Sequence, residues 1–174
     1  MINRFKLTIL ASFLILIFIS CTTVVKNTKR SGFRYVVPTD MQENPDLARK
    51  FRYDNFIVEK GKFYLESNIL IAIRHSNNEE NYSIKIFAEQ DQSVLKNQVN
   101  IRYDDKWIPP GFIEKKIPFI SYQFSYISNK TILYQRSVYI KYNNIAYVVS
   151  MFSKDKEFLL HEKNDFFWEN IRID

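Results

Sequence analysis

Alternation of apolar and polar residues is clearest in the last third of the chain and predicts three neighbouring β-strands. The segments are 121–127, 131–142 and 145–152, in which aromatic or β-branched residues recur at every second position and Arg136 interrupts the middle run. That period is typical of a strand. Residues 128–130 and 143–144 are turn formers. We therefore expect an antiparallel three-stranded meander, with 145–152 as an inner strand.

Two earlier segments also read as strands. Phe33–Val37 is short, aromatic and β-branched, and it ends at Pro38, which favours an opening strand. Residues 69–73 are all apolar. This continuous apolar run predicts a central strand over Asn68–Arg74 that is covered on both faces.

Three segments have helical features. Asn44-Pro45-Asp46 places a capping residue, a proline and an acid before a helix that should end near Phe51. Between Asn78 and Asn97, residues Tyr82, Ile86, Gln90 and Val94 recur every four positions, although Tyr82, Ile84 and Ile86 also alternate as in a strand. Lys154–Glu157 should open a terminal helix that runs through Trp168 and is followed by Ile171-Arg172-Ile173.

Two further segments have turn and loop features. Lys60-Gly61 separates 55–59 from 62–66 and predicts a hairpin. Residues 99–118 contain Asp104-Asp105 and Pro109-Pro110. Because adjacent prolines remove backbone donors, this segment cannot form a central strand and is expected to be a long loop.

The two ends of this pattern resemble a known fold. The strand 145–152, a polar step, a terminal helix and the closing run 167–173 are similar to the carboxyl end of the PsbP and Mog1-like families, and 33–38 is similar to their first strand. Many members continue with Pro-Trp, whereas Pro38 is followed by Thr39 here. The resemblance implies an α+β fold in which helices pack on the faces of an antiparallel sheet. It also implies a binding or assembly role.

The amino terminus has the features of a secretion signal. Arg4 and Lys6 precede 13 apolar-rich residues, Leu7–Ile19, which as a helix would cover only ~20 Å of a bilayer core of ~30 Å. Ser20-Cys21 resembles the lipobox of bacterial lipoproteins, although the family usually has Leu where Phe18 stands. The resemblance implies cleavage after residue 20 and lipid attachment at Cys21. The alternative is a transmembrane anchor, since Leu7–Val25 has 19 residues without charge and is just long enough to span.

These observations predict a three-part chain: a signal peptide at 1–20, the lipid-attachment cysteine with a flexible tether at 21–32, and one globular domain at 33–174. The basic tether either contacts an anionic membrane surface or is simply solvated. Loss of the signal leaves 23 cations against 19 anions, a mild excess that does not favour nucleic acid as a partner. We expect a domain outside the cytoplasm, anchored to the outer rather than the inner membrane.

Few residues could support catalysis or bind a metal. Cys21 is the sole cysteine, and only His75 and His161 supply imidazoles, so a zinc site is not expected. Both histidines are expected to be partly exposed structural residues. Asp104-Asp105 could in principle face calcium, but the regular oxygen-ligand spacing of a calcium loop is missing. The sequence predicts no cofactor and no enzyme.

Two binding functions remain open. The first is a lipid-anchored interaction or assembly module that contacts an envelope protein or component through the loop 104–116. The residues expected to make that contact are Asp104, Asp105, Trp107, Lys115 and Lys116. The alternative for Trp107 is a lid over the core. The second function is a carrier or sensor of a small apolar ligand between helix and sheet, with an aromatic stripe (Tyr122, Phe124, Tyr126, Tyr134, Tyr139, Tyr147) as cleft or as plain core.

Overall fold

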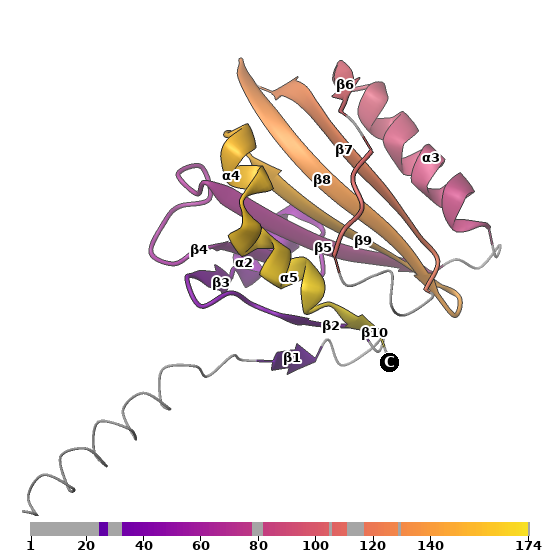
Figure 1. Ribbon diagram of the computed structural model, residues 1–174, viewed down its shortest axis with the longest axis horizontal. Helices are drawn as coiled ribbons and strands as arrows, with labels where there is room; N and C mark the ends of the chain where they lie inside the picture. The colour runs from indigo at the N-terminus through magenta and orange to yellow at the C-terminus, as the bar shows by residue number, and fades with distance from the viewer. Residues whose placement is uncertain are drawn as a thin grey trace, which may run out of the picture.

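The computed structural model describes residues 25–27, 33–77, 82–104, 106–110, 117–128 and 130–173 of the 174-residue chain. Its main element is a seven-stranded, wholly antiparallel sheet with the order β3-β4-β5-β9-β8-β7-β6 (Figure 1). The strands are β3 (Met41–Glu43), β4 (Asn55–Glu59), β5 (Ile69–Asn77), β6 (Ile101–Tyr103), β7 (Phe119–Ser128), β8 (Thr131–Tyr142) and β9 (Ile145–Ser153).

The predicted meander is confirmed as β7, β8 and β9. Tyr142 pairs with Ile145 across the two-residue turn at Asn143-Asn144, and Asn143 takes a φ of 53°, a conformation that asparagine tolerates better than most residues. The predicted central strand is β5, which lies between β4 and β9. Because β9 has partners on both sides, it is the expected inner strand.

A second, three-stranded sheet joins the two ends of the described chain. It contains β1 (Val25–Asn27), β2 (Phe33–Val36) and β10 (Arg172–Ile173) in the order β1-β2-β10. The predicted opening strand is therefore confirmed, and the closing run pairs with it. Residues 25–27 lie within the predicted tether, yet they pair with Val36, Tyr35 and Arg34.

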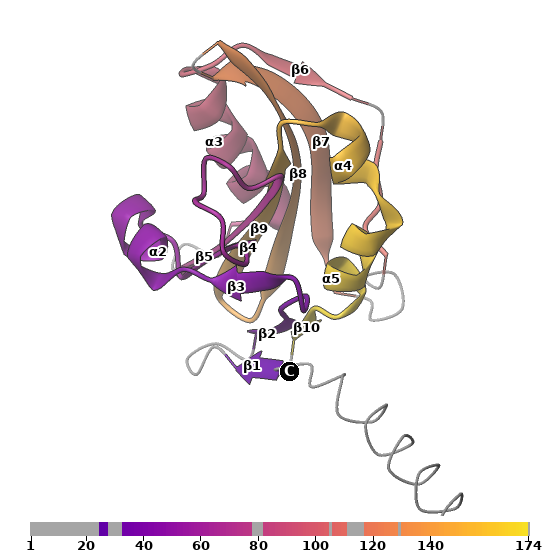
Figure 2. The same cartoon turned by 90° about the vertical axis from the view of Figure 1, so that its left-hand side faces the viewer.

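One face of the large sheet is closed by this small sheet and by the carboxyl-terminal helices. Phe33 on β2 stacks on Tyr147 of β9 with 5.0 Å between ring centroids. Figure 2 shows α4 (Lys156–Leu160) and α5 (Asp165–Glu169) on the same side of the sheet. The interior is aromatic and aliphatic, and Val149, Phe167 and Trp168 are fully buried within it. We call this side the closed face.

The terminal helix was predicted as one element and is in fact two. His161 takes an extended conformation (φ −64°, ψ 135°) that ends α4, and a 3-10 turn, η2 (Glu162–Asn164), leads into α5. The Asn164 side chain donates to the carbonyl of Phe158 at 2.5 Å. The same carbonyl also accepts from the His161 amide at 3.4 Å, so the side chain adds a second bond at the end of α4, where carbonyls lack intrahelical partners.

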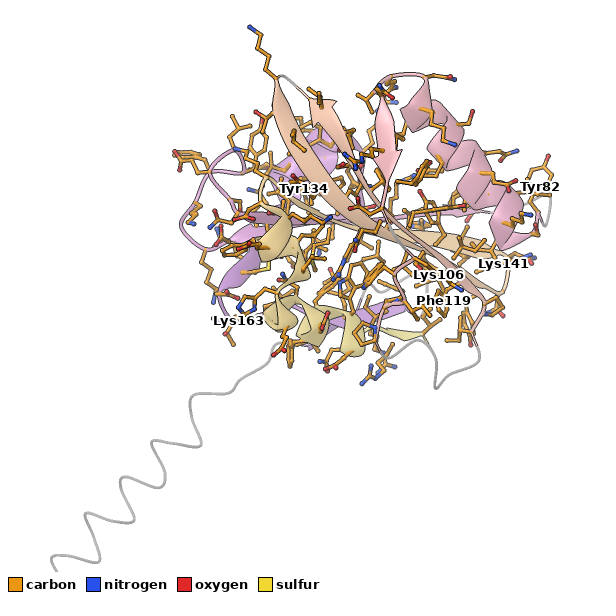
Figure 3. The ribbon with its side chains drawn as sticks, turned by 45° about the horizontal axis from the view of Figure 1, so that its top comes forward. Tyr82, Lys106, Phe119, Tyr134, Lys141 and Lys163 are labelled. Carbon is orange, nitrogen blue, oxygen red and sulfur yellow. The ribbon has the colours of Figure 1, made fainter. Side chains whose placement is uncertain are left out.

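The opposite face carries α2 (Pro45–Phe51) and α3 (Ile84–Lys96), as Figure 2 shows. The predicted start of α2 is confirmed, since the Asn44 side chain accepts from the Leu47 amide at 3.1 Å. Lys141 of β8 donates to the Tyr82 carbonyl at 3.1 Å just before α3 (Figure 3). We call this side the groove face.

The predicted apolar side of α3 was wrong. Tyr82, Ile86 and Val94 are 38%, 42% and 59% exposed, whereas Ala88 and Gln92 are buried against the sheet. The helix also begins at Ile84 rather than near Asn78, because Ser83 caps it by accepting from the Ile86 amide at 3.3 Å.

Two other expectations were wrong in part. Residues 62–66 form no second hairpin strand, because the amides of Glu66 and Ser67 bond back to the Phe63 carbonyl and close a turn. The segment 99–118 is not irregular throughout, since residues 101–103 form β6 against residues 124–126 of β7.

Several predictions fall on residues that the structure does not describe: the signal peptide 1–20, Cys21, most of the tether at 22–32, and Asp105, Lys115 and Lys116 of the predicted contact loop. Within the described ranges, none of the helices has the length and hydrophobicity needed to span a bilayer.

Candidate binding groove

The groove face holds an open pocket of about 510 Å³ beside α2, which we call the α2 groove. Apolar and aromatic side chains dominate its lining. The lining residues are Phe51, Tyr53, Phe56, Tyr64, Leu65, Ser67, Leu70, Tyr126, Ser128, Thr131, Leu133, Phe152, Ser153 and Lys154. The volume is within the usual range for a small-molecule site, ~300–1,000 Å³.

The floor of the groove comes from strands that are paired on both sides. Leu70 of β5 lies opposite Phe152 of β9, which lies opposite Gln135 of β8. Because side chains alternate along a strand, Leu133 shares the face of Gln135. Phe56 of β4 lies beside them, opposite Ala72. The backbone donors and acceptors of these strands are occupied within the sheet, so the groove offers side chains rather than a free strand edge.

The wall of the groove is an aromatic cluster on α2 and the turn after β4. Phe51 lies 5.8 Å from the ring of Phe56 and edge-on to Tyr64 at 6.0 Å. Tyr53 packs edge-on against Phe56 at 6.0 Å. Lys50 extends its ammonium over the rings of Phe51 and Tyr64, 5.4 and 5.9 Å from their centroids. Such contacts hold a cation at an aromatic rim.

The turn at 63–67 is fastened by side-chain hydrogen bonds. Ser67 Oγ accepts from the Glu59 amide and donates to the Ile69 carbonyl, both at 2.9 Å. Burial alone would raise the pKa of Glu59, but bonds from the Asn68 amide and from Lys62 outweigh it and lower that pKa. The turn is therefore a fixed feature of the groove.

The mouth of the groove exposes large apolar side chains. Phe63 and Leu65 on the turn are 78% and 62% exposed. Lys154 donates to the carbonyl of Leu65 at 2.5 Å. In the part of the chain that the structure describes, no carboxylate pairs with this ammonium. Exposed apolar residues beside a pocket commonly mark a binding surface.

The tyrosine hydroxyl at the floor is neutral. Burial raises the pKa of Tyr126 to about 12, so its phenol stays protonated at physiological pH. Deeper in the sheet, Gln135, Ser137 and Ser150 form a closed hydrogen-bonded cluster, with 2.8 Å between the two serine oxygens. The groove thus presents apolar surface and neutral hydroxyls.

The aromatic stripe expected from the sequence is divided between the two faces. Tyr122, Phe124, Tyr126 and Tyr139 lie on the groove face, whereas Tyr134 and Tyr147 lie on the closed face. Only Tyr126 of this stripe lines the α2 groove. Tyr139 is held below α3, where its hydroxyl donates to Asp91 at 2.6 Å and accepts from Gln92 at 2.7 Å.

Of the predicted contact residues, the two that the structure describes, Asp104 and Trp107, lie on the closed face. Asp104 borders a depression of about 400 Å³ and is 3.5 Å from the ammonium of Lys156, which borders it as well. Tyr134 lines the same depression and lies beside α4 (Figure 3). Its described lining contains three charged residues, Arg102, Asp104 and Lys156, whereas that of the α2 groove contains Lys154 alone.

Trp107 is half-buried and folds onto the core. Its ring meets Trp168 edge-on at 5.2 Å, and the guanidinium of Arg136 lies 4.5 Å from its centroid. Burial lowers the pKa of Arg136, although Asp165 nearby opposes this effect. Arg136 also donates to Gln123 at 2.8 Å. These contacts match the lid alternative for Trp107.

The two histidines have structural contacts. His75 Nδ1 is 2.6 Å from the carboxylate of Asp54, and both side chains are partly exposed. His161 accepts from the Lys163 amide at 3.2 Å. Across the described ranges, no three His, Cys, Asp or Glu side chains gather closely enough to hold a metal ion.

The α2 groove was missed from the sequence because its wall was read as a strand. Phe63, Tyr64 and Leu65 follow Gly61, whose φ of +72° marks a turn. Three consecutive large apolar residues in a turn are unusual in a soluble domain, since turns favour Gly, Pro, Asn, Asp and Ser. That run was the available signal.

Comparison with known proteins shows the fold. No family model matches the chain, and no curated protein matches its sequence. Among solved structures, the cyanobacterial PsbP protein CyanoP of Synechocystis sp. PCC 6803 superposes with a TM-score of 0.59 at 6% identity, over 89% of this chain and 95% of that one. LpqN of Mycobacterium tuberculosis, which is involved in cell envelope biogenesis, gives 0.54 at 14% identity, over 88% and 86%. The expected α+β, PsbP-like fold is therefore confirmed.

Proposed function

We propose that the chain is a lipid-anchored, non-catalytic interaction module of the bacterial cell envelope. The features of residues 1–21 support the anchor. The fold shared with LpqN, an envelope-biogenesis protein, supports the compartment. The observation that supports the binding role is the α2 groove. The aromatic side chains of its wall and the exposed apolar side chains at its mouth are not needed to fill the hydrophobic core.

The position of strand β1 limits how far an anchored domain could lie from the membrane. Val25 begins that strand only four residues after Cys21, so an anchored domain would start within ~14 Å of the lipid attachment point. The joined ends of β7 and β8, which border the groove, lie at the end of the molecule remote from β1 (Figures 1 and 2). An anchor at Cys21 would then leave the hairpin end of the groove remote from the attachment point.

A second candidate function is a carrier or sensor of a small apolar ligand. The volume and aromatic lining of the α2 groove favour it, because ligand sites are mostly apolar with few polar groups. The two functions share one site and differ in its occupant.

The anchor is tested by Cys21→Ser. This variant should remain an unprocessed precursor without labelled palmitate, because no other cysteine can accept the lipid. Palmitate incorporation that persists in the variant would refute the anchor.

The interaction role is tested by capture from envelope extracts. Leu133→Trp fills the groove, and Val94→Trp adds the same ring on the exposed side of α3 as a matched control. We expect an envelope component to be captured by the wild type and the control but lost from Leu133→Trp. Equal capture by all three proteins would contradict binding through the groove.

A further inference from the structure

We propose that the α2 groove binds the hydrocarbon chain of a single-chain anionic amphiphile, such as a long-chain carboxylate, with its head group at Lys154. This inference rests on the second candidate function and names its ligand class. Three features of the groove support this ligand class. Its floor consists of side chains without a free strand edge, its mouth is positively charged, and its described lining contains no acidic residue.

The floor favours a hydrocarbon over a peptide strand. Phe56, Leu70, Leu133 and Phe152 belong to β4, β5, β8 and β9, each of which has a neighbour on both sides. An added strand would need an open sheet edge for its backbone hydrogen bonds. A methylene chain needs no such partner, and it gains by covering apolar surface.

The walls favour a chain over a compact polar molecule. Phe51, Tyr53, Tyr64 and Leu65 stand along one side, and Tyr126 keeps its proton because burial raises its pKa. The hydroxyls that border the floor, Ser128 and Thr131, lie at its hairpin end. The other two serines of the lining, Ser67 and Ser153, already bond to backbone groups. Most of the remaining lining is apolar side chain and aromatic ring.

The mouth favours an anionic head. Among the described residues that line the groove, Lys154 is the one charged residue. Its hydrogen bond to the Leu65 carbonyl leaves two of its three ammonium donors available. Lys50 adds a second cation above Phe51 and Tyr64 at the wall. A carboxylate or phosphate at Lys154 would complement its charge, whereas a cationic head would be repelled.

The test uses the mature lipid-modified protein, reconstituted in nanodiscs of phosphatidylcholine. The probes are a photoreactive 16-carbon carboxylate and its methyl ester, and labelled positions are mapped by mass spectrometry. We expect the carboxylate to label the segments that carry Leu65, Leu70 and Phe152. Leu133→Trp should reduce this labelling at least tenfold, while the control Val94→Trp leaves it unchanged.

The head-group contact has its own variant and control. Lys154→Glu should reduce carboxylate labelling to the level of the ester, whereas Lys163→Glu, on η2 at the closed-face side (Figure 3), should not. Thermal unfolding establishes that each variant is folded. If Leu133→Trp is not, Leu65→Glu at the exposed mouth replaces it.

Labelling spread evenly over the surface, or unaffected by Leu133→Trp, would overturn the proposal. So would equal labelling by acid and ester, because the charge at Lys154 would then have no role. If the groove takes no label while Leu133→Trp still loses an envelope protein, the hydrocarbon ligand is refuted and the interaction function stands. If both fail, the groove is not a binding site.

Discussion

The two faces of the large sheet are built from the same strands but differ in how they are covered. On the closed face, the small sheet, α4, α5 and Trp107 leave a continuous interior that contains Val149 and Trp168 at zero exposure. On the groove face, α2 and α3 cover separate apolar clusters, and the α2 groove stays open. The closed face therefore carries most of the stability, while the groove face has apolar surface left for a ligand.

The largest expected effect is on the closed face. Val149→Asp would bury an unpaired carboxylate between Ile73 and Val138, at a cost of at least ~3 kcal/mol, which is enough to unfold a domain of ordinary stability. Circular dichroism at increasing temperature measures this loss. A soluble variant with an unchanged melting temperature would contradict the inner placement of β9.

Trp107→Ala asks whether the predicted contact residue belongs to the closed face. Removing a half-buried indole from Trp168 and Arg136 should cost ~2 kcal/mol, and denaturant unfolding would show it. If stability is retained and an envelope partner is lost instead, Trp107 is a binding residue and the loop 104–116 is the contact site.

Tyr139→Phe probes the covered half of the groove face. The change removes the hydroxyl that links Asp91 and Gln92 beneath α3. The buried side-chain amide of Gln92 then loses one hydrogen-bond acceptor. We expect a loss of ~1–3 kcal/mol in the free energy of unfolding. Binding at the α2 groove should not change, because Tyr139 does not line it. Reduced ligand labelling would show that the two halves of the face are coupled.

The smallest effect is expected on the outer side of α3. Val94→Asp changes a residue that is 59% exposed, so the free energy of unfolding should stay within ~0.5 kcal/mol of the wild type. A loss above 1.5 kcal/mol would mean that Val94 packs inward, as the sequence first predicted.

The sequence predicted the closed face better than the groove face, for a physical reason. Apart from Arg136, strands β7, β8 and β9 alternate regularly, because one side of each strand packs into a continuous core. Their antiparallel pairing could therefore be predicted from the sequence. On α3 the residues that pack inward are Ala88 and Gln92. Hydrogen bonds from polar side chains hold this helix against the sheet. A prediction from the spacing of apolar residues therefore placed the wrong side of the helix against the core.

The same reason explains why the candidate site was missed. The segment 62–66 was predicted to be the second strand of a hairpin, yet Phe63 and Leu65 remain in solvent at the mouth of the groove. The mixture of acids, prolines, lysines and one indole in the loop 104–116 predicted a contact surface, and this contact role stays a prediction. The indole of Trp107 packs against Trp168. Composition showed that aromatic residues were abundant, but the fold determines which of them stay uncovered.

The difference between the faces is tested most directly by placing a photo-crosslinking amino acid at one exposed apolar position on each. Leu65 lies at the mouth of the groove, and Phe158 on α4 is 43% exposed on the closed face. In intact cells, the full-length protein should form a discrete adduct from position 65 and none from position 158. Adducts of equal yield at both positions, or at 158 alone, would contradict a binding role for the groove face.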